Sequence, residues 1–345
     1  MKRQEQIVSA WQDGMPDGVW DLMDHYIATA NEWLGPLAGR QLPRDRSWAA
    51  RQLALPRVVD STWLRPTAPV AVGSGWVHAD LIEDDVKHFE RLLDTTRPHP
   101  ERLAAEAQRW RLPVTPYRQE LSPARDEAVE PPPRQAHRSL RGMRVVDLTT
   151  LWAGPLATSL LANAGAEVWK LDPSVRRDGF YERPALYREL NRGKQVLDLD
   201  LRDSADRSHF EMLVASADLV IDSFSRRVLP NFGYSPQELR RIKPDVATIS
   251  IVAFPADVEE RDWLSYGGGI HAVSGLGMRT GAATPPPAAY PDPLSGMRAF
   301  TAALCLLATR GDRPHVEISL LGSVAPLVER ALERWSVKSG AAQSP

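Results

Sequence analysis

The stretch LRGMRVVDLTTLWAGPLATSLLANAGAEVWKLDP, residues 140–173, contains the pattern that decides the fold. Its β-branched run at 143–150 predicts a strand, the apolar segment at 155–165 predicts a helix, and EVWKLD at 167–172 predicts a second strand. Two strands joined by a helix of this length are typical of a parallel crossover unit. The stretch therefore predicts the start of an alternating α/β domain.

The same alternation continues through the second half of the chain. Runs rich in Val, Ile and Leu predict further strands, and the amphipathic segments between them predict helices. We expect strands at 195–201, 217–224 and 245–254, helices at 204–217 and 235–244, a long buried helix from Pro291, and a strand and a final helix within 315–335. Strands this apolar favour a Rossmann-like parallel sheet with helices on both faces, in an α/β protein.

The first half of the chain has a different character. Residues 1–50 are expected to be mostly helical, and residues 70–118 to form a small α/β unit with a strand, two helices and a closing strand. The segment 122–139 is rich in proline and charge, which predicts a linker. We thus expect an N-terminal domain at 1–121, a Rossmann-like domain at 140–335 and a disordered tail at 336–345.

Composition narrows the classes of partner. The formal net charge is −2 and the pI is near 6.5, so electrostatics favours neither nucleic acid nor an anionic membrane as a partner. No apolar run is long enough to span a bilayer and the first residues show no signal-peptide pattern, which predicts a cytoplasmic protein. A single cysteine, Cys305, excludes an internal disulfide and a thiolate-rich metal site. Its apolar neighbours predict a buried structural thiol.

Two short motifs suggest chemistry without specifying it. The segment 152–168 follows a strand and opens a helix, an arrangement that directs backbone N–H groups at an anion, but it is neither GxGxxG nor a P-loop. In AAYPDPLSGMRAF, residues 288–300, Asp292 stands between Pro291 and Pro293, just before an apolar run. From the residues alone, Asp292 is either the N-cap of the following helix or a reactive carboxylate.

Taken in order, five stretches between Leu140 and about Leu320 resemble the class III CoA-transferase family, which includes formyl-CoA transferase, carnitine CoA-transferase and α-methylacyl-CoA racemase. The opening stretch resembles the family's first strand, "AGP" helix and second strand. NRGKQVLDLDL, ADLVIDSFSRRVLPNFGYSPQELRRIKPDVATISI and SYGGGIHAVSGL resemble its next three elements, and PDPLSGMRAF matches the segment with the catalytic aspartate. The resemblance implies an enzyme that binds CoA in its Rossmann-like domain.

The family chemistry implies a role for Asp292. The carboxylate attacks an acyl-CoA thioester to form a mixed anhydride, the released CoA thiolate then forms an enzyme-bound thioester, and CoA passes to a second carboxylic acid. A carboxylate is a poor nucleophile unless it is held in line and shielded from water. The flanking prolines restrict its backbone, and N–H groups of a Gly-rich turn are suited to stabilise the oxyanion. The resemblance thus implies acyl-CoA as substrate, with no permanently bound cofactor and no metal.

The resemblance also implies residues that bind CoA. Lys170 matches a basic residue near the CoA phosphates, Leu199 a position beside the nucleotide, and Ser223 and Phe224 a loop around the adenine and pantetheine. Each also has a structural interpretation, with Lys170 as a solvated charge at a strand end and Leu199 and Phe224 as core residues. Further phosphate-compatible charge is offered by Arg192 and Lys194, although the latter is equally consistent with an ordinary surface lysine.

The chain also departs from the family pattern. Tyr266 and Gly267 replace the histidine and aspartate of the racemases, which argues against racemisation, and His271 is expected to be a packed or surface residue. The family's GDxxR segment is altered to SVRRDGFYERP, with Asp178 and Gly179 in changed order. Trp152 stands near a position that often holds glutamine, so we expect an acyl pocket of different size and polarity.

The order of the two halves is unusual for this family. Residues 70–118 resemble its small domain, which normally follows the large one, so we hypothesise a circularly permuted relative. Relatives are interlocked dimers, and we expect a simpler homodimer here. Two alternatives to a CoA-transferase stay open: a non-catalytic paralogue that binds CoA esters as a partner subunit, and another acyl-CoA enzyme, a racemase or an acyltransferase.

Overall fold

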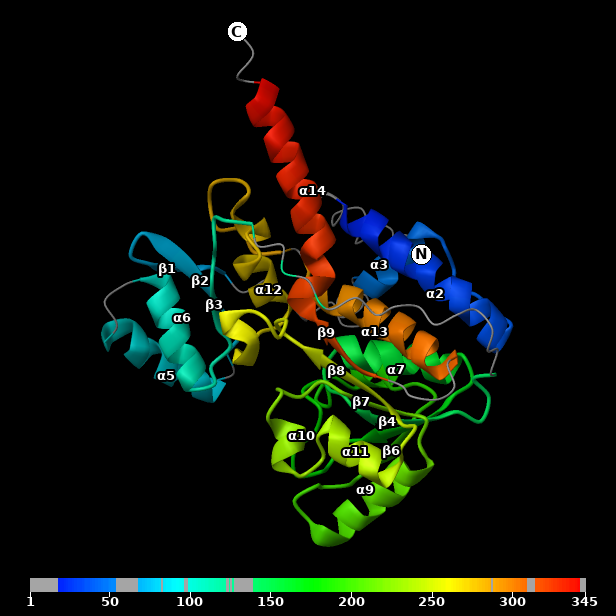
Figure 1. Cartoon of the computed structure of the whole chain (residues 1–345). Coiled ribbons are helices and arrows are strands. Elements are labelled where there is room, and N and C mark those ends of the chain that lie inside the picture. Colours follow the sequence, from blue (N-terminus) through cyan, green and yellow to red (C-terminus); the bar gives the residue numbers. More distant parts are fainter. Residues whose placement is uncertain are drawn as a thin grey trace.

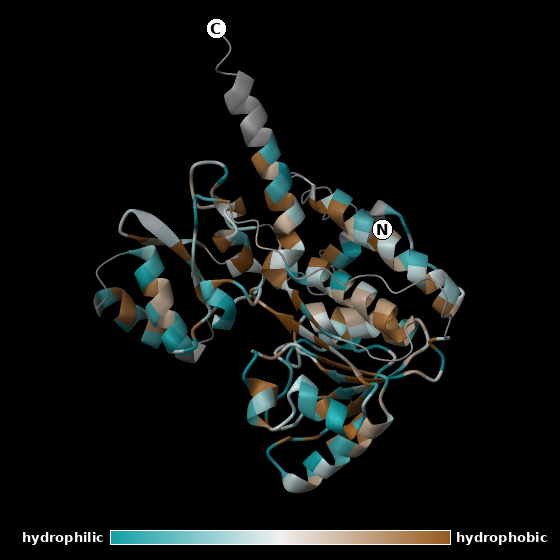
Figure 2. Ribbon diagram, in the orientation of Figure 1, coloured by the Kyte–Doolittle hydropathy of each residue, from teal (hydrophilic) through white to brown (hydrophobic). Residues whose placement is uncertain are grey.

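The computed structural model describes residues 18–53, 68–81, 83–95, 99–121, 124, 126, 139–286, 288–308 and 314–341. These residues form a large α/β unit and a smaller unit, which lie beside one another with helix α12 (Gly267–Val273) between them (Figure 1). Apolar residues are concentrated around the central sheet, whereas the outer helix faces are more polar (Figure 2).

The large unit is built on a six-stranded parallel sheet with the order β6-β5-β4-β7-β8-β9. Its strands are β4 (Arg144–Leu148), β5 (Glu167–Leu171), β6 (Gln195–Leu197), β7 (Leu219–Asp222), β8 (Ala247–Val252) and β9 (His315–Ser319). In chain order this is the 3-2-1-4-5-6 arrangement of Rossmann-like sheets, which confirms the predicted fold class. The strand order reverses between β4 and β7, where such folds form a crevice at the carboxyl ends of the strands.

Alternation along the strands assigns residues to the two faces of the sheet. On β4, Val145 belongs to one apolar core, and Val146 and Leu148 belong to the other. The first core is covered by α7 (Ala153–Asn163), α8 (Pro184–Leu190), α13 (Pro291–Ala308) and α14 (Leu320–Ala341), and the second by α9 (Ser204–Ser216), α10 (Val228–Asn231) and α11 (Pro236–Ile242) (Figure 1).

Local signals mark where these helices begin. The Asp203 carboxylate accepts hydrogen bonds from the backbone N–H groups of Ala205 and Asp206, and so caps α9. Pro236 occupies the first turn of α11, and the Ser235 hydroxyl accepts a hydrogen bond from the N–H of Glu238. The amphipathic segments therefore form helices close to the predicted bounds.

Two N-terminal helices complete the first core. Helices α2 (Val19–Ala38) and α3 (Arg46–Leu53) pack on α13, and the apolar side of α2 joins the main core of the large unit. Helical structure in this region agrees with the expectation from the sequence. The domain division stays a prediction, but residues expected in one domain at 1–121 contribute to both units. The reason is that the apolar face of α2 is buried against α13.

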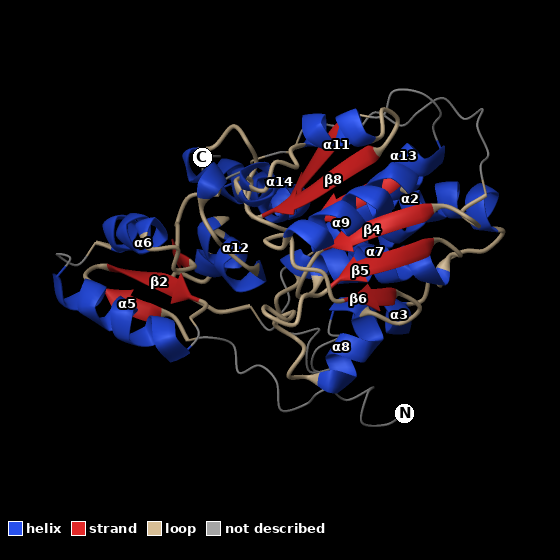
Figure 3. Cartoon of the chain, turned by 90° about the horizontal axis from the view of Figure 1, so that it is seen from below, coloured by secondary structure: helices blue, strands red, loops and turns tan. Residues whose placement is uncertain are grey.

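The small unit is an antiparallel sheet with two helices. Strands β1 (Val70–Val72), β2 (Gly75–Ala79) and β3 (Val114–Pro116) pair in chain order, and α5 (Glu83–Thr95) and α6 (Pro100–Arg109) cover one face (Figure 3). The other face lies against α12 (Gly267–Val273). The strand, two helices and closing strand expected within 70–118 are therefore confirmed.

The predicted linker and tail have different outcomes. Most of 122–139 lies outside the described residues, but Asp126 is described, and its buried carboxylate accepts hydrogen bonds from Arg298 and from the N–H of Ser319. The tail predicted at 336–345 is wrong for residues 336–341, because α14 continues to Ala341 through a segment without proline; residues 342–345 lie outside the described part. No helix in the described part of the chain is long and apolar enough to cross a membrane.

Candidate functional site

The switch point of the sheet brings together the ends of β4 and β7. The backbone N–H of Thr150 donates a 2.9 Å hydrogen bond to the hydroxyl of Ser223, which links the loops that follow the two strands. The last residue of β7, Asp222, accepts hydrogen bonds from the Ser250 hydroxyl and from the N–H of Phe224. Burial raises the pKa of Asp222 to about 6. Two of the predicted CoA-binding residues, Ser223 and Phe224, therefore lie at the expected crevice.

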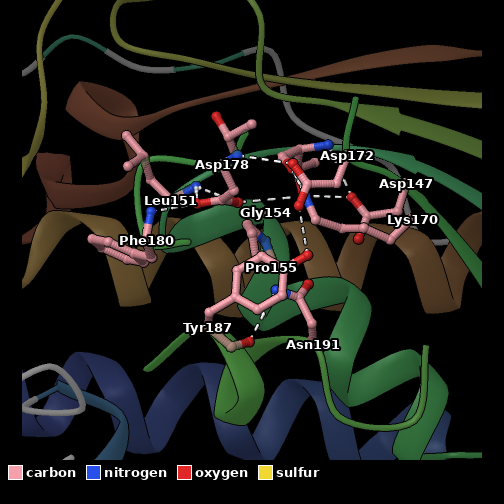
Figure 4. Close-up of polar contacts among 12 residues, drawn as sticks. Asp147, Leu151, Gly154, Pro155, Lys170, Asp172, Asp178, Phe180, Tyr187 and Asn191 are labelled. Atoms are coloured by element: carbon pink, nitrogen blue, oxygen red, sulfur yellow. Dashed lines mark hydrogen bonds and ion pairs between the residues drawn. The ribbon is translucent and has the colours of Figure 1, made fainter. Parts of the chain in front are cut away.

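Lys170 lies in a buried ion-pair network beside this crevice (Figure 4). Its side chain is fully buried on β5, and its ammonium group donates to the carbonyl of Thr149 and lies 3.4 Å from the Asp178 carboxylate. Asp178 also accepts from the N–H groups of Leu151 and Phe180. The alternative interpretation of Lys170 as a solvated strand-end charge is thus wrong. Its predicted role at the CoA phosphates stays a prediction.

The altered GDxxR segment supports an unusual backbone conformation. Leu151 has a φ of 66°, which is rare for a residue with a side chain. Asp178 accepts its N–H, and a side chain on Gly179 would place Cβ 2.6 Å from a Leu151 methyl carbon. Asp178 and Gly179 therefore hold the turn between β4 and α7 in place.

A second buried pair lies close by. Lys194 has a fully buried ammonium group 3.0 Å from the Asp147 carboxylate, and it also donates to the carbonyl of Pro155 and the side chain of Asn191. Lys194 is consequently not a surface lysine. Burial lowers its pKa to about 8, although the Asp147 charge opposes this shift.

The remaining predicted CoA-binding residues lie elsewhere. Leu199 is a core residue on the α9 face of the sheet. Arg192 is exposed and pairs with Glu189 at 2.7 Å. The structure thus places Lys170, Ser223 and Phe224 at the carboxyl edge of the sheet, while Arg192 lies on the surface.

Asp292 is the second residue of α13 and is buried. It lies within the first turn, and its Oδ2 has no hydrogen-bond partner, so the N-cap interpretation does not hold. Burial and, to a smaller extent, the negative charge of Asp80 raise the pKa of Asp292 to about 7, whereas the backbone N–H of Gly267 opposes the shift. This carboxylate is desolvated and poised near neutrality.

Three consecutive glycines fit α12 against both units. A side chain on Gly267 would overlap Oδ2 of Asp292, and one on Gly268 would overlap the Nε2 edge of His78. A side chain on Gly269 would place Cβ 2.7 Å from the hydroxyl of Thr115. The glycine run therefore permits close packing of Asp292 from α13 on one side and of β2 and β3 on the other.

Buried polar atoms without a hydrogen-bond partner gather at this junction. Within the described residues they include both ring nitrogens of His78, Oδ2 of Asp80, the hydroxyl of Tyr117 and Oδ2 of Asp292. His78 Nε2 lies 3.0 Å from Asp80 Oδ1, within ion-pair reach but without the angle of a hydrogen bond. Folded proteins seldom leave buried polar atoms unsatisfied, so the group indicates a site that binds a polar ligand.

Sequence reasoning missed His78, Asp80 and Tyr117. They lie in an ordinary-looking strand and loop of the first half, about two hundred positions from Asp292, and no local motif marks them. The period of two in β2 places His78 opposite the small core, which contains Val77. Only the contact with α12 indicates a function for these residues.

Other titratable residues near the site have structural roles. His271 is buried, and its ring nitrogens pair with the hydroxyl of Tyr290 and the carbonyl of Thr284. Burial lowers the pKa of His271 to about 4, so the expectation of a packed histidine is confirmed. Cys305 is buried, as predicted. Among the described residues, no group of three His, Cys, Asp or Glu is placed to hold a metal ion.

Comparison with known proteins gives this fold and site a family. The model of CoA-transferase family III matches residues 140–345. This chain belongs to CoA-transferase family III. The family match includes the whole parallel sheet and Asp292, whereas residues 1–139, with His78 and Asp80, precede it.

Two curated relatives of this family III chain are CoA-transferases. The acetyl-CoA:oxalate CoA-transferase of Acetobacter aceti is 28% identical over 210 residues, which cover 56% of this chain and 54% of the relative. The succinyl-CoA:mesaconate CoA-transferase of Haloarcula hispanica is 30% identical over 222 residues, which cover 57% of this chain and 56% of the relative. The matches thus span little more than half the length of these relatives.

A solved structure shares the fold. A CAIB/BAIF family protein from Brucella suis superposes with a TM-score of 0.53 at 24% sequence identity, and the match covers 60% of this chain and 58% of that protein. This likeness shows that the two proteins share a fold.

Proposed function

We propose that this family III chain is a CoA-transferase that uses Asp292 as its nucleophile and passes CoA from an acyl-CoA to a carboxylic acid. The observation that carries the proposal is the buried Asp292 carboxylate, whose Oδ2 has no partner and lies against Gly267. A desolvated carboxylate is a better nucleophile than a hydrated one, and the surrounding structure limits hydrolysis of an anhydride.

The steps balance without a cofactor. The Asp292 carboxylate attacks the thioester carbonyl, the carbon–sulfur bond breaks, and CoA leaves as a thiolate from a mixed anhydride. The thiolate then attacks the aspartyl carbonyl, which releases the first carboxylate and leaves CoA on Asp292. The acceptor carboxylate reverses these steps and departs as a new acyl-CoA. The N–H of Gly267, which already interacts with the Asp292 carboxyl, is suited to stabilise its oxyanion.

The two relatives suggest which substrates to test first. Their names specify acetyl-CoA with oxalate and succinyl-CoA with mesaconate, and in each pair the acceptor is a carboxylic acid. We extend this to the present chain as a proposal for the acceptor class. The Rossmann-like sheet would hold CoA at its switch point, where Ser223 and Phe224 lie.

A trapping experiment tests the proposal. The protein is incubated with acetyl-CoA or succinyl-CoA and quenched with hydroxylamine, and peptide mass spectrometry then locates any aspartyl hydroxamate. We expect the modification at Asp292 and none in Asp292→Asn, with a rate that rises with pH up to about 7 as the carboxyl ionises. The exposed control Asp94→Asn should behave as the wild type.

The outcome separates the proposed function from its rivals. CoA binding without modification of Asp292 would favour a non-catalytic paralogue that serves as a partner subunit. Modification of a different residue, or turnover in Asp292→Asn, would favour another acyl-CoA enzyme. Lys170 pairs with Asp178, and Lys194 pairs with Asp147. Because both ammonium groups already have carboxylate partners, the first rival should be tested.

Three further expectations remain proposals. We propose that residues 70–118 are a circularly permuted small domain; the mixed α/β structure of this region is compatible with that hypothesis, which an unrelated helical bundle would have excluded. We also propose a homodimer, which light scattering of the purified chain tests. We propose a cytoplasmic location as well, which subcellular fractionation tests.

A further inference from the structure

The small unit contributes a histidine and an aspartate to the side of α12 that faces Asp292. His78 and Asp80 are two residues apart along β2 and its continuation, so their side chains lie on the same face of the sheet and point away from the small core. The N–H of Asp80 donates to the carbonyl of Pro113, which continues the pairing of β2 with β3 and holds this strand end. The pair is therefore fixed by a sheet rather than by a flexible loop.

The position of His78 is set by Gly268. A side chain at Gly268 would place its Cβ 2.6 Å from Cε1 of His78. A side chain at the neighbouring Gly267 would overlap Oδ2 of Asp292. His78 and Asp292 thus contact consecutive residues of one helix. Thr115, the cross-strand partner of His78, donates a 3.2 Å hydrogen bond to the carbonyl of Gly269 and fixes this approach.

The state of His78 is unusual for a buried histidine. Its side chain is 3% exposed, yet neither ring nitrogen has a hydrogen-bond partner. His271 provides the contrast, since both of its nitrogens are satisfied. A buried imidazole with unsatisfied nitrogens beside a carboxylate resembles the oriented histidine–carboxylate pairs that transfer protons in many enzymes.

We propose that His78 is the proton donor and acceptor for the CoA sulfur, and that Asp80 is the positioning residue that orients its ring. The inference rests on the proposed function. When Asp292 attacks and the carbon–sulfur bond breaks, the departing thiolate takes a proton from the His78 imidazolium, which gives a thiol and a neutral imidazole. Before the second attack the thiol returns this proton to His78, and the thiolate so regenerated attacks the aspartyl carbonyl.

This assignment gives a reason for the small unit to pack on α12, the helix that also contacts Asp292. The family-matched region supplies the nucleophile, and the region before it supplies the proton. The proton-transferring group thus comes from β2, which lies outside the family-matched region.

The test compares two thioesters that differ in their need for a proton. Acetyl-CoA releases a basic alkyl thiolate, whereas S-(4-nitrophenyl) thioacetate releases an arylthiolate that leaves unprotonated. We expect His78→Gln to slow CoA release from acetyl-CoA about 100-fold or more, the usual effect of losing a general acid. The same variant should change acetylation of Asp292 by the aryl thioester less than about threefold, and Asp80→Asn should show the same selectivity with a smaller loss.

The controls make each outcome decisive. His315→Gln removes a half-buried histidine at the first residue of β9, which pairs with Thr248, and it should leave both rates unchanged. Equal losses with the two thioesters would overturn the inference in favour of a structural role, and unchanged rates in His78→Gln would also overturn it. If neither thioester labels Asp292 in the wild type, the proposed function itself fails and this inference falls with it.

Discussion

At the scale of single residues, Asp292 combines two opposing requirements. Its burial makes the charged form costly, while the proposed chemistry needs that form. A functional residue of this kind commonly reduces stability, because it is retained for reactivity and not for packing. The N-cap role that the sequence left open would have stabilised the helix, and the structure does not show it.

The burial of the Asp292 carboxyl group predicts how the stability of the fold depends on pH. The pKa of Asp292 is about 7 in the folded chain and near 4 when unfolded, so the folded state binds the proton more tightly and loses stability as pH rises from about 4 to 7. Asp292→Asn removes that loss and should be more stable than the wild type by about 1 kcal/mol at pH 5 and about 4 kcal/mol at pH 8.

Urea unfolding at the two pH values measures this effect. The exposed variant Asp94→Asn, on α5, should show no comparable change with pH. A stability difference for Asp292→Asn that is constant with pH, or that shrinks as pH rises, contradicts the assignment of a desolvated carboxyl group.

At the scale of elements, the turn between β4 and α7 depends on a buried pair. Asp178 compensates the charge of Lys170 and accepts the N–H of Leu151, whose backbone is in the left-handed region. The sequence placed β4, α7 and β5 correctly, because their apolar periods are local properties. It did not show that Lys170 points inward, since a strand of five residues has no local feature that distinguishes a buried lysine from a solvated one.

Breaking this pair should be costly. Asp178→Asn leaves the Lys170 ammonium buried without its charge partner, and we expect a loss of about 3 kcal/mol in the free energy of unfolding. Lys170→Met alone should also destabilise, and the double variant should lose less than the sum of the two. Chemical unfolding of the four proteins gives the coupling free energy, and a value near zero would show that the two side chains act independently.

At the scale of the whole molecule, distant segments meet at Asp126. Its carboxylate lies 2.6 Å from Arg298 of α13, and Arg298 also donates to the hydroxyl of Ser323 in α14. The hydroxyl of Tyr26, in α2, donates to the carbonyl of Ser323. One residue of the predicted linker thus binds α13 directly, and Arg298 and Ser323 extend the network to α14 and α2.

We expect this junction to contribute to global stability. Asp126→Asn leaves Arg298 without its carboxylate, and a loss of about 1–3 kcal/mol should appear as a lower urea midpoint with an unchanged slope. The control is Glu167→Gln, which breaks the exposed pair with Arg144 and should cost less than about 0.5 kcal/mol. Equal effects of the two variants would show that Asp126 is no more important than a surface charge.

The sequence by itself determined the parallel sheet, its helices and the candidate nucleophile. Apolar periods of two and 3.6 residues, helix caps and the order of the family-like stretches are all properties of neighbouring residues. Tertiary structure alone decided what surrounds Asp292. His78 and Asp80 reach it only because β2 packs against the glycines of α12, and burial raises the Asp292 pKa only once α12 and α13 are packed together. Contacts between residues far apart in the chain leave no local pattern, so these features emerge only from the folded molecule.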